Sequence, residues 1–393
     1  MKEPKIRFKG FSGEWKECTL SNIITVNSGK DYKHLEKGTI PVYGTGGYML
    51  SVNTSLSEHD AIGIGRKGTI DKPQYLKAPF WTVDTLFFLT TNNGDNLDFL
   101  FSLSQNIRWQ KYDESTGVPS LSKNNIDKIR TCIPNKFEQQ SVASFFTSLD
   151  AQISASTSRL ASLKQMKAAS LQAMFPQEGE TVPKVRFKGF EGEWKKVKFD
   201  KAFSFLKNNS LSRAELCNDG DIINIHYGDV LIKYGDILDI GNDEVIYVAD
   251  SNVANKLYTD CPIVNGDIII ADAAEDFTVG KCVEVQNVTK QKIVSGLHTI
   301  PCRPLESTAP NFWGYYINSN SFHRQLLPMI QGSKISSISK TSLSATYVVF
   351  PVVEEQQSIA FFFTSLDRQI ALHTQRLEKL KQIKAACLDK MFV

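Results

Sequence analysis

Two long stretches of the chain place apolar residues at alternating steps of four and three, the spacing of a coiled-coil seam. We therefore predict long helices within 134–176 and 350–393. Both seams become polar near the middle and again late in the helix. The first seam consists of Val142, Phe146, Leu149, Ile153, Ser156, Leu160, Leu163, Lys167, Ser170 and Met174. The second consists of Ile359, Phe363, Leu366, Ile370, His373, Leu377, Leu380, Lys384, Cys387 and Met391.

Shorter apolar runs, interrupted by Gly, Asn and Asp, occupy the regions before each helix. Examples are 61–64, 85–89 and 267–271. Runs of this length, bounded by turn residues, are typical of strands. The sequence therefore predicts two strand-rich mixed α/β domains over about 16–133 and 195–349, an α+β fold class.

The chain is an internal duplication. The box Pro4–Trp15 recurs as Pro183–Trp194, with changes only at Ile6/Val185 and Ser12/Glu191. The helical stretch that begins Glu-Gln-Gln-Ser and contains Phe-Phe-Thr-Ser-Leu-Asp also occurs twice, whereas the regions between box and helix barely resemble each other. We call the repeated boxes and helices the frame. A repeated frame around two dissimilar regions indicates two recognition domains on one scaffold.

The repeats and a polar, Pro-bounded linker at 176–183 divide the chain. We predict a first box and domain at 1–133, a first helix at 134–176, a linker and repeated box at 177–194, a second domain at 195–349 and a second helix at 350–393. Two similar helices that are separated by a whole domain favour an antiparallel coiled coil with a pseudo-two-fold axis. Some 38 helical residues would make a rod of roughly 57 Å.

Ser156 and His373 occupy matching central positions of the two seams. A polar core residue can fix the register of a coiled coil at some cost in stability, although a weak seam position can also merely tolerate it. Asn135 followed by Glu138 is a plausible N-cap signal for the first helix, whereas Val352–Glu355 lacks a capping side chain. The first helix is therefore the better signalled.

Composition is that of a globular protein. The 393 residues are 41% hydrophobic and 22% charged, with a formal net charge of +3, so nucleic-acid binding would have to rely on local clusters of Lys and Arg. Seven scattered cysteines form no zinc-like pattern and are expected to be reduced thiols. With no apolar leader and no run long enough to span a bilayer, we expect a cytoplasmic protein.

Motifs for catalysis are absent from the sequence. An adenine methyltransferase needs an Asn/Asp-Pro-Pro-aromatic segment, and an ATP motor needs G-x-x-x-x-G-K-[ST]; the chain has neither. The six histidines do not cluster with Cys or acidic residues at ligand or triad spacing. We therefore expect a non-catalytic protein without a metal or cofactor of its own.

The segment from Gly63 to Gly68 matches G-x-G-x-x-G, but Pro73 soon after it argues against a phosphate-binding helix. With Arg66 and Lys67 set among glycines, it is better interpreted as a loop that can approach DNA closely. An ordinary basic turn is the alternative.

Near the end of each domain lies a Gly-led segment rich in hydroxyl groups, 116–123 and 331–340, which suits either phosphate contacts or a turn. The second domain is acidic, so its DNA-facing surface should be a limited patch. The candidate DNA contacts are Lys30, Lys33, Arg66, Lys67, Thr116, Gly117, Ser120, Lys123, Lys207, Arg213, Lys233, Lys281, Ser333 and Lys334.

The duplicated Lys-x-Arg-Phe-Lys-Gly-Phe-x-Gly-Glu-Trp box and the Glu-Gln-Gln-Ser … Phe-Phe-Thr-Ser-Leu-Asp helix resemble the specificity subunits of type I restriction-modification enzymes, over essentially the whole chain. The resemblance implies two target-recognition domains that read the halves of a bipartite DNA site. It also implies two modification subunits, which methylate adenine with S-adenosylmethionine, and restriction subunits that use ATP and magnesium. The resemblance does not indicate which residues of this chain contact bases.

Two alternatives remain open: a coiled-coil adaptor between two protein-binding domains, and the recognition subunit of a related methyltransferase-nuclease. Charged residues on the helix exteriors, among them Arg159, Lys164, Lys167 and Arg376, are interpreted either as solvated surface or, with Phe145 and Phe362, as parts of two equivalent docking sites.

Overall fold

The computed structural model describes residues 3–332 and 335–393. The chain folds as two compact units: unit 1 comprises Met1–Arg159 and His373–Val393, and unit 2 comprises Leu160–Leu372. Each unit therefore contains one box, one strand-rich domain and a part of both long helices. We call the strand-rich parts the first domain and the second domain.

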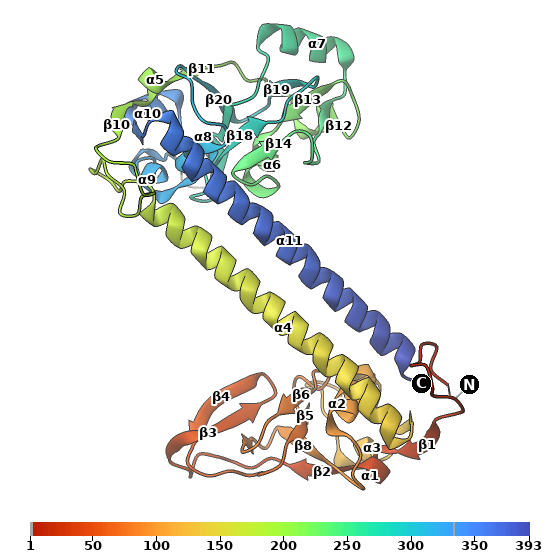
Figure 1. The fold of residues 1–393 in the computed structure, drawn as a ribbon. Coiled ribbons are helices and arrows are strands. Elements are labelled where there is room, and N and C mark those ends of the chain that lie inside the picture. Colours follow the sequence, from red (N-terminus) through yellow and green to blue (C-terminus); the bar gives the residue numbers. More distant parts are fainter. Residues whose placement is uncertain (1–2, 333–334) are drawn as a thin grey trace. The chain divides into compact units, whose positions relative to one another are not determined.

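The two long helices are α4 (Lys136–Ala173) and α11 (Val353–Met391) (Figure 1). In unit 1, Lys384 of α11 forms an ion pair with Asp150 of α4 at 2.6 Å, and Met391 packs near Val142. In unit 2, Lys167 of α4 pairs with Asp367 of α11 at 2.7 Å. The late part of each helix thus meets the early part of the other, which confirms the predicted antiparallel pairing.

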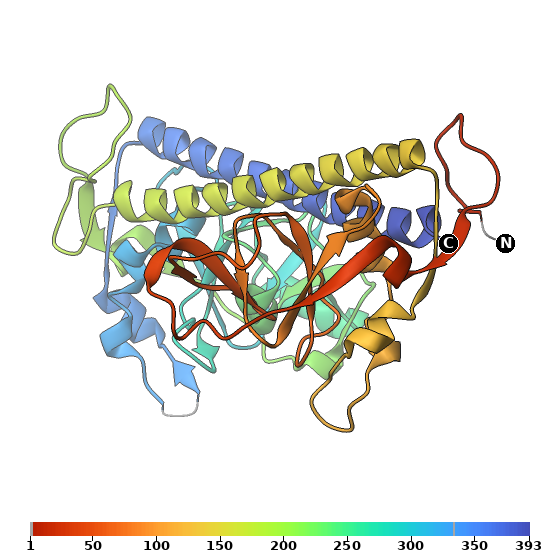
Figure 2. The same ribbon diagram turned by 90° about the horizontal axis from the view of Figure 1, so that it is seen from below.

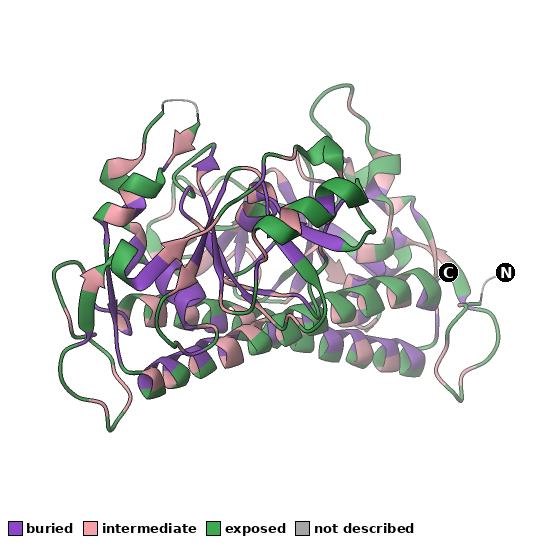
Figure 3. Ribbon diagram, turned by 90° about the horizontal axis from the view of Figure 1, so that it is seen from above, coloured by how far each residue is buried: buried purple, intermediate pink, exposed green. Residues whose placement is uncertain are grey.

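Heptad positions lie on the least exposed face of each helix (Figure 3). Phe146, Leu149, Leu163, Phe363, Leu366 and Leu377 are buried, and Ile153, Leu160, Ile370 and Leu380 are half-buried. The polar seam residues have different environments. Ser156 is buried, while the Nδ1 atom of His373 is buried without a hydrogen-bond partner among the described residues. Lys167 is not a solvated exterior charge, because it contacts Asp236 as well as Asp367.

Asn135 accepts a hydrogen bond from the backbone N–H of Glu138 at 3.0 Å, as its N-cap signal predicts. The second helix forms without such a cap. In both helices a glutamine of the Glu-Gln-Gln-Ser motif donates instead to the carbonyl of the preceding proline: Gln139 to Pro134 at 3.2 Å and Gln356 to Pro351 at 2.9 Å. The repeated motif therefore fixes both helix starts.

The described residues of unit 1 form three sheets. A two-stranded ribbon joins β1 (Lys16–Thr19) to β9 (Arg130–Ile133). The four-stranded sheet has the order β2 (Ile24–Ser28), β8 (Leu86–Thr91), β5 (Ala61–Gly65), β6 (Gln74–Leu76). The three-stranded sheet has the order β4 (Gly47–Val52), β3 (Lys37–Gly44), β7 (Trp81–Thr82). The short helices are α1 (Leu20–Ile23), α2 (Leu97–Asn106), the 3-10 turn Trp109–Tyr112 and α3 (Lys123–Asp127).

Unit 2 is built on a related plan with more strands. Its ribbon joins β10 (Lys195–Lys198) to β22 (Tyr347–Phe350). The five-stranded sheet has the order β11 (Phe203–Phe205), β20 (Thr299–Pro304), β16 (Ile268–Ala271), β18 (Cys282–Gln286), β14 (Ile237–Asp239). The four-stranded sheet has the order β12 (Leu216–Cys217), β15 (Tyr247–Val248), β13 (Ile222–Ile225), β19 (Lys292–Ser295).

A last ribbon of unit 2 pairs β17 (Ala273–Ala274) with β21 (Ser336–Ser337). The helices of this unit are α5 (Phe199–Ala202), α6 (Tyr227–Ile232), α7 (Ser251–Asp260), α8 (Phe312–Asn318), α9 (Asn320–His323) and α10 (Lys340–Ala345), with 3-10 turns at Arg213–Glu215 and Leu327–Met329. The observed strands confirm the predicted strand-rich α+β class. No helix within the described ranges is both long and apolar enough to cross a bilayer.

Each box is drawn as an open loop (Figure 2) that is clamped to the first turn of a long helix. Arg7 donates to both carboxylate oxygens of Glu138, at 2.7 and 2.8 Å, and to the carbonyl of Gly13 at 2.6 Å. In the second box, Arg186 contacts Glu355 at 2.7 and 2.8 Å. The Arg and Glu that occur in both copies of the frame therefore hold each box against the start of a long helix.

The end of each long helix completes the core of a unit. In unit 1 the ring of Phe392 lies 6.1 Å from Trp15, 5.5 Å from Phe99 and 5.8 Å from Phe146, measured between ring centroids. The backbone N–H of Ile6 also donates to the carbonyl of Lys390 at 3.0 Å. Phe175 has the same role in unit 2, where it lies 5.9 Å from Phe363.

Candidate nucleic-acid interface

In the first domain, the predicted basic loop and the predicted hydroxyl segment lie against each other. The loop follows β5, and no helix follows it directly, in keeping with the rejection of a phosphate-binding helix. The N–H of Leu121 donates to the carbonyl of Arg66 at 2.9 Å, and that of Gly68 donates to Pro119 at 2.8 Å. Lys67 and Ser120 form an antiparallel bridge. Two segments about fifty residues apart in sequence thus form one surface.

Asp113 shapes the hydroxyl segment. Its carboxylate accepts hydrogen bonds from the backbone N–H groups of Ser115 at 3.0 Å and Ser120 at 2.9 Å, which lower the pKa of this carboxyl. Thr116 and Gly117 lie between these two anchors and are exposed. The segment therefore presents its tip to solvent in a fixed turn.

The cations of this surface have different environments. The guanidinium of Arg66 lies 3.5 Å from the carbonyl of Asp84 and 5.8 Å from the ring centroid of Phe87, so neighbouring groups position it. Lys67 is exposed, and none of the described residues forms an ion pair with its ammonium group. Lys123 is exposed at the first position of α3. Lys67 is thus free to contact an anion.

Two further segments meet the basic loop. A Cβ atom at Gly68, whose φ is +96°, would lie 3.8 Å from the hydroxyl of Thr45 in the turn of the β3–β4 hairpin. The backbone N–H of Lys30 donates to the carbonyl of Thr82 at 2.8 Å, and that of Arg66 donates to Thr85 at 2.8 Å. Segment 82–85 therefore forms backbone hydrogen bonds with both Lys30 and Arg66.

Lys33 is exposed beside a shallow groove of about 750 Å³ that runs along the β3–β4 hairpin. Tyr48, 63% exposed, and Lys37 also line this groove. A cation and an exposed aromatic ring are groups that commonly contact nucleic acid.

The second domain repeats the pairing of loop and hydroxyl segment. The N–H of Ile338 donates to the carbonyl of Asp272 at 3.0 Å, and Ala273 pairs with Ser337. In both domains the next serine caps a short helix: Ser122 accepts from the N–H of Asn125, and Ser339 accepts from that of Ser342. The predicted contacts Ser333 and Lys334 lie outside the described residues.

The cations proposed for the second domain are mostly engaged within it. Arg213 forms an ion pair with the buried Asp229 at 2.6 Å, and Lys233 pairs with Glu244 at 2.9 Å. Lys207 is exposed and lies elsewhere, with its backbone N–H directed at the Sγ atom of Cys261 at 3.4 Å.

The Lys281 ammonium donates to the carbonyls of Leu231 and Tyr234, both at 2.9 Å. Burial lowers the pKa of Lys281. The ammonium group of this lysine therefore points to the end of α6, and its contact with DNA stays a prediction.

The backbone position that Arg66 occupies in the first domain is occupied in the second domain by Asp272, whose carboxylate contacts a histidine. The Asp272 carboxylate lies 3.2 Å from Nδ1 of His298, whose ring packs edge-on to Tyr227 at 5.2 Å. Burial raises the pKa of Asp272, and His298 partly opposes that shift. His298, Tyr227 and Ala273 also line a pocket of about 510 Å³.

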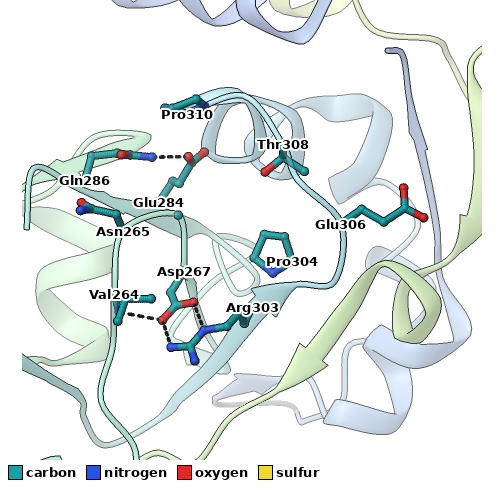
Figure 4. Close-up of a pocket in the computed structure, with 11 residues that line it drawn as sticks. Val264, Asn265, Asp267, Glu284, Gln286, Arg303, Pro304, Glu306, Thr308 and Pro310 are labelled. Atoms are coloured by element: carbon teal, nitrogen blue, oxygen red, sulfur yellow. Dashed lines mark hydrogen bonds and ion pairs between the residues drawn. The ribbon is translucent and has the colours of Figure 1, made fainter. Parts of the chain in front are cut away.

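Another pocket of the second domain, of about 270 Å³, is lined by acidic and amide side chains (Figure 4). Three of its charged groups are hydrogen-bonded within the pocket: Arg303 donates to both oxygens of Asp267 at 2.7 Å, and Glu284 accepts from Gln286 at 2.6 Å. Within 3–332 and 335–393, no cluster of three or more His, Cys, Asp or Glu side chains is arranged to hold a metal ion.

Sequence reasoning found the two hydroxyl segments but not their partners. The pairing of Leu121 with Arg66 joins residues whose spacing carries no periodic signal, so only the folded chain reveals it. The position of Asp272 is likewise not indicated by a search for basic residues, because its side chain is acidic. The repeated Ser-Lys at 122–123 and 339–340 was the available signal, since the offset of the segments places Leu121 opposite Ile338.

Known proteins resemble the chain over most of its length. It is 19% identical over 309 residues to the type I restriction enzyme MjaVIII specificity subunit of Methanocaldococcus jannaschii, covering 75% of this chain and 69% of that protein. The crystal structure of the type I restriction-modification S subunit from M. genitalium superposes with a TM-score of 0.65 at 14% identity, covering 100% of this chain and 99% of that one.

A second solved chain, from a study of complex assembly and conformational transition of the type I restriction-modification system, gives a TM-score of 0.52 at 15% identity and covers 96% and 97% of the two chains. At such identities the structural likeness establishes the fold. The family model described as the type I restriction modification DNA specificity domain matches twice, at residues 12–165 and 192–382, one match for each copy of the duplication. The chain therefore belongs to the family of type I restriction-modification specificity subunits.

Proposed function

We propose that the chain reads a bipartite, asymmetric DNA site, with one recognition domain on each half, and that its duplicated frame carries two modification subunits and the restriction subunits. The observation that carries the proposal is the loop and hydroxyl segment found in both domains. In each domain the same backbone pairing, Arg66 with Leu121 and Asp272 with Ile338, brings a Gly- and Ser-rich segment beside a polar side chain.

The contrast between frame and domains supports this division of labour. The ion pairs between box and helix are the same in both units, with Arg7–Glu138 matched by Arg186–Glu355. The loop residues are opposite in character, with Arg66 in one domain and Asp272 in the other. Equal frames suit two copies of one partner, and unlike loops suit two different half-sites.

Chemistry is assigned to the partners. We expect S-adenosylmethionine to bind to the modification subunits, and ATP and magnesium to bind to the restriction subunits, while this chain acts as a non-catalytic reader. The double-stranded DNA contacts on its side are polar and basic groups such as Lys67, Thr116 and Ser120, which suit phosphate oxygens.

The test is sequencing of methylated adenines in DNA from cells that carry the chain with its neighbouring modification subunit. We expect a new bipartite motif that is absent from cells lacking the chain. Exchange of residues 16–133 for another recognition domain should then change only one half of the motif. No new methylation with a bound, active modification subunit would overturn the proposal in favour of a coiled-coil adaptor.

A further inference from the structure

The loop position after the central strand is equivalent in the two domains. In the first domain the N–H of Arg66 donates to the carbonyl of Thr85 at 2.8 Å, and its own carbonyl accepts from Leu121 at 2.9 Å. In the second domain the N–H of Asp272 donates to the backbone carbonyl of His298 at 3.1 Å, and the carbonyl of Asp272 accepts from the N–H of Ile338 at 3.0 Å. The backbone surroundings of Arg66 and Asp272 therefore match on both sides.

Both side chains are held by groups from the strand region next to them. Arg66 lies against the carbonyl of Asp84 and the ring of Phe87. Asp272 is oriented by His298, and its side chain keeps 27% of its surface exposed. A side chain that is both positioned and accessible loses little conformational freedom on binding. Such a side chain suits recognition of a particular base better than nonspecific attraction to DNA.

The two side chains have opposite hydrogen-bonding chemistry. A guanidinium only donates and matches the O6 and N7 acceptors of guanine in the major groove. An ionised carboxylate only accepts and matches an exocyclic amino group of cytosine or adenine. A carboxylate near DNA is repelled by the phosphates, so it is compatible with close approach when it receives a hydrogen bond from a base edge.

We propose that Arg66 and Asp272 are the same base-reading position in the two domains, Arg66 recognising acceptor atoms of a guanine and Asp272 recognising a base amino group. This inference rests on the proposed reading of DNA by both domains. It assigns opposite chemistry to one place in a duplicated fold, so the two half-sites differ there by construction. The acidic character of the second domain then contributes to recognition.

The test removes single hydrogen-bonding groups from the DNA bases. The complex of this chain with its modification subunit is bound to duplexes that carry the methylated motif. At each guanine of the half-site assigned to the first domain, 7-deazaguanine removes N7. At each adenine or cytosine of the other half-site, purine or 2-pyrimidinone removes the amino group. Wild-type affinity should fall about 5- to 150-fold at one position of each half-site.

The variants identify the residue that detects the missing atom. Arg66→Ala should abolish the sensitivity to 7-deazaguanine, and Asp272→Ala should abolish the sensitivity to loss of the amino group, each in its own half-site. Asp221→Asn removes a carboxylate from an exposed position of the second domain and should retain full sensitivity. If Asp272→Ala unfolds, Asp272→Glu replaces it, and the displaced carboxylate should reduce the sensitivity at the same position.

The outcomes separate the two proposals. If the wild-type complex methylates no bipartite motif, the proposed function fails and this inference fails with it. If it methylates a motif and the folded Arg66 and Asp272 variants respond to every substituted base as wild type does, only the shared reading position is overturned. Sensitivity that is lost in the other half-site from the one assigned would also overturn it.

Discussion

Arg7 and Glu138 are 131 positions apart in the sequence and form a two-pronged ion pair in which the carboxylate side chain is 1% exposed. Arg186 and Glu355 repeat the contact in unit 2. One difference separates the copies: Nε1 of Trp15 lies 3.3 Å from Glu138, whereas Nε1 of Trp194 is buried without a partner among the described residues. The second clamp therefore depends more heavily on its arginine.

Arg186→Ala should lower the free energy of unfolding by about 3 kcal/mol, because it leaves the buried Glu355 carboxylate without its countercharge. Urea titration followed by fluorescence measures the effect. Lys188→Ala, at an exposed position of the same box, is the matched control and should leave the midpoint unchanged. Equal midpoints for the two variants would show that the clamp does not stabilise the unit.

Leu163→Lys should destabilise the helix pair by about 3 kcal/mol or more, because Leu163 is 1% exposed in the seam and the substitution buries an ammonium group. Ala161→Lys places the same side chain on an exposed position of the same helix and should leave the melting temperature close to that of wild type. A Leu163→Lys protein that melts with the control would contradict the seam.

His373→Leu should raise the free energy of unfolding by about 1 kcal/mol. The reason is that the buried Nδ1 atom of His373 lacks a hydrogen-bond partner among the described residues, and leucine removes that unsatisfied group. Gln375→Leu, on an exposed face of the same turn, controls for added hydrophobicity. A loss of stability in His373→Leu would instead indicate that the histidine sets the register of the helices.

Lys67→Ala should weaken DNA binding to all sequences alike and reduce the slope of log affinity against log salt by about 0.9, the loss of one phosphate contact. Binding is measured from low to moderate salt with cognate and unrelated duplexes. Lys16→Ala, an exposed lysine on β1, should keep the wild-type slope. An unchanged slope in Lys67→Ala would remove this lysine from the phosphate contacts.

Glu284 should make stability depend on pH. Burial raises the pKa of its carboxyl to about 7, although the N–H groups of Asn311 and Gly314 donate to it at 2.6 and 2.9 Å. Because the folded state holds this proton more tightly than the unfolded chain, its contribution is complete below about pH 4.5 and is lost as pH rises to about 7.

The size of this contribution is about 3 kcal/mol. Unfolding of wild type and Glu284→Gln is compared between pH 4.5 and 8. The difference between the two proteins should change with pH up to about 7 and stay constant above it. A difference that is independent of pH would show that Glu284 keeps an ordinary pKa in the folded protein.

The frame was predictable from the sequence because its signals are periodic or repeated. Heptad spacing identified both helices and their buried positions, and the duplicated box indicated a common role before its contact with the helix was known. The partner of Arg7 was not predictable, since a salt bridge leaves no spacing rule when its members are 131 residues apart.

The candidate DNA contacts are less predictable from the sequence, because charge alone does not tell whether a side chain is accessible. Lys281 was selected as a cation of the second domain, but its ammonium holds two backbone carbonyls. Asp236, one of the acidic residues of the second domain, forms an ion pair with Lys167 of α4. Whether a charged side chain faces solvent or a neighbour is decided by the tertiary fold, which composition does not encode.

The contact of Phe392 with Trp15, Phe99 and Phe146 has a consequence for synthesis of the protein. The ribosome completes the first domain long before it reaches residue 392, at elongation rates that make the interval roughly 10 to 50 s. During that time the aromatic core of unit 1 lacks the ring of Phe392. Unit 2, whose equivalent ring Phe175 precedes its domain, never waits in this way.

The nascent first domain must therefore remain soluble with an open hydrophobic site until the second half arrives to close it. A chain that ends before residue 392 would leave Trp15, Phe99 and Phe146 without this ring contact. The core of unit 1 is therefore complete only when the second half of the chain has also been made, because Phe392 supplies one of its aromatic rings.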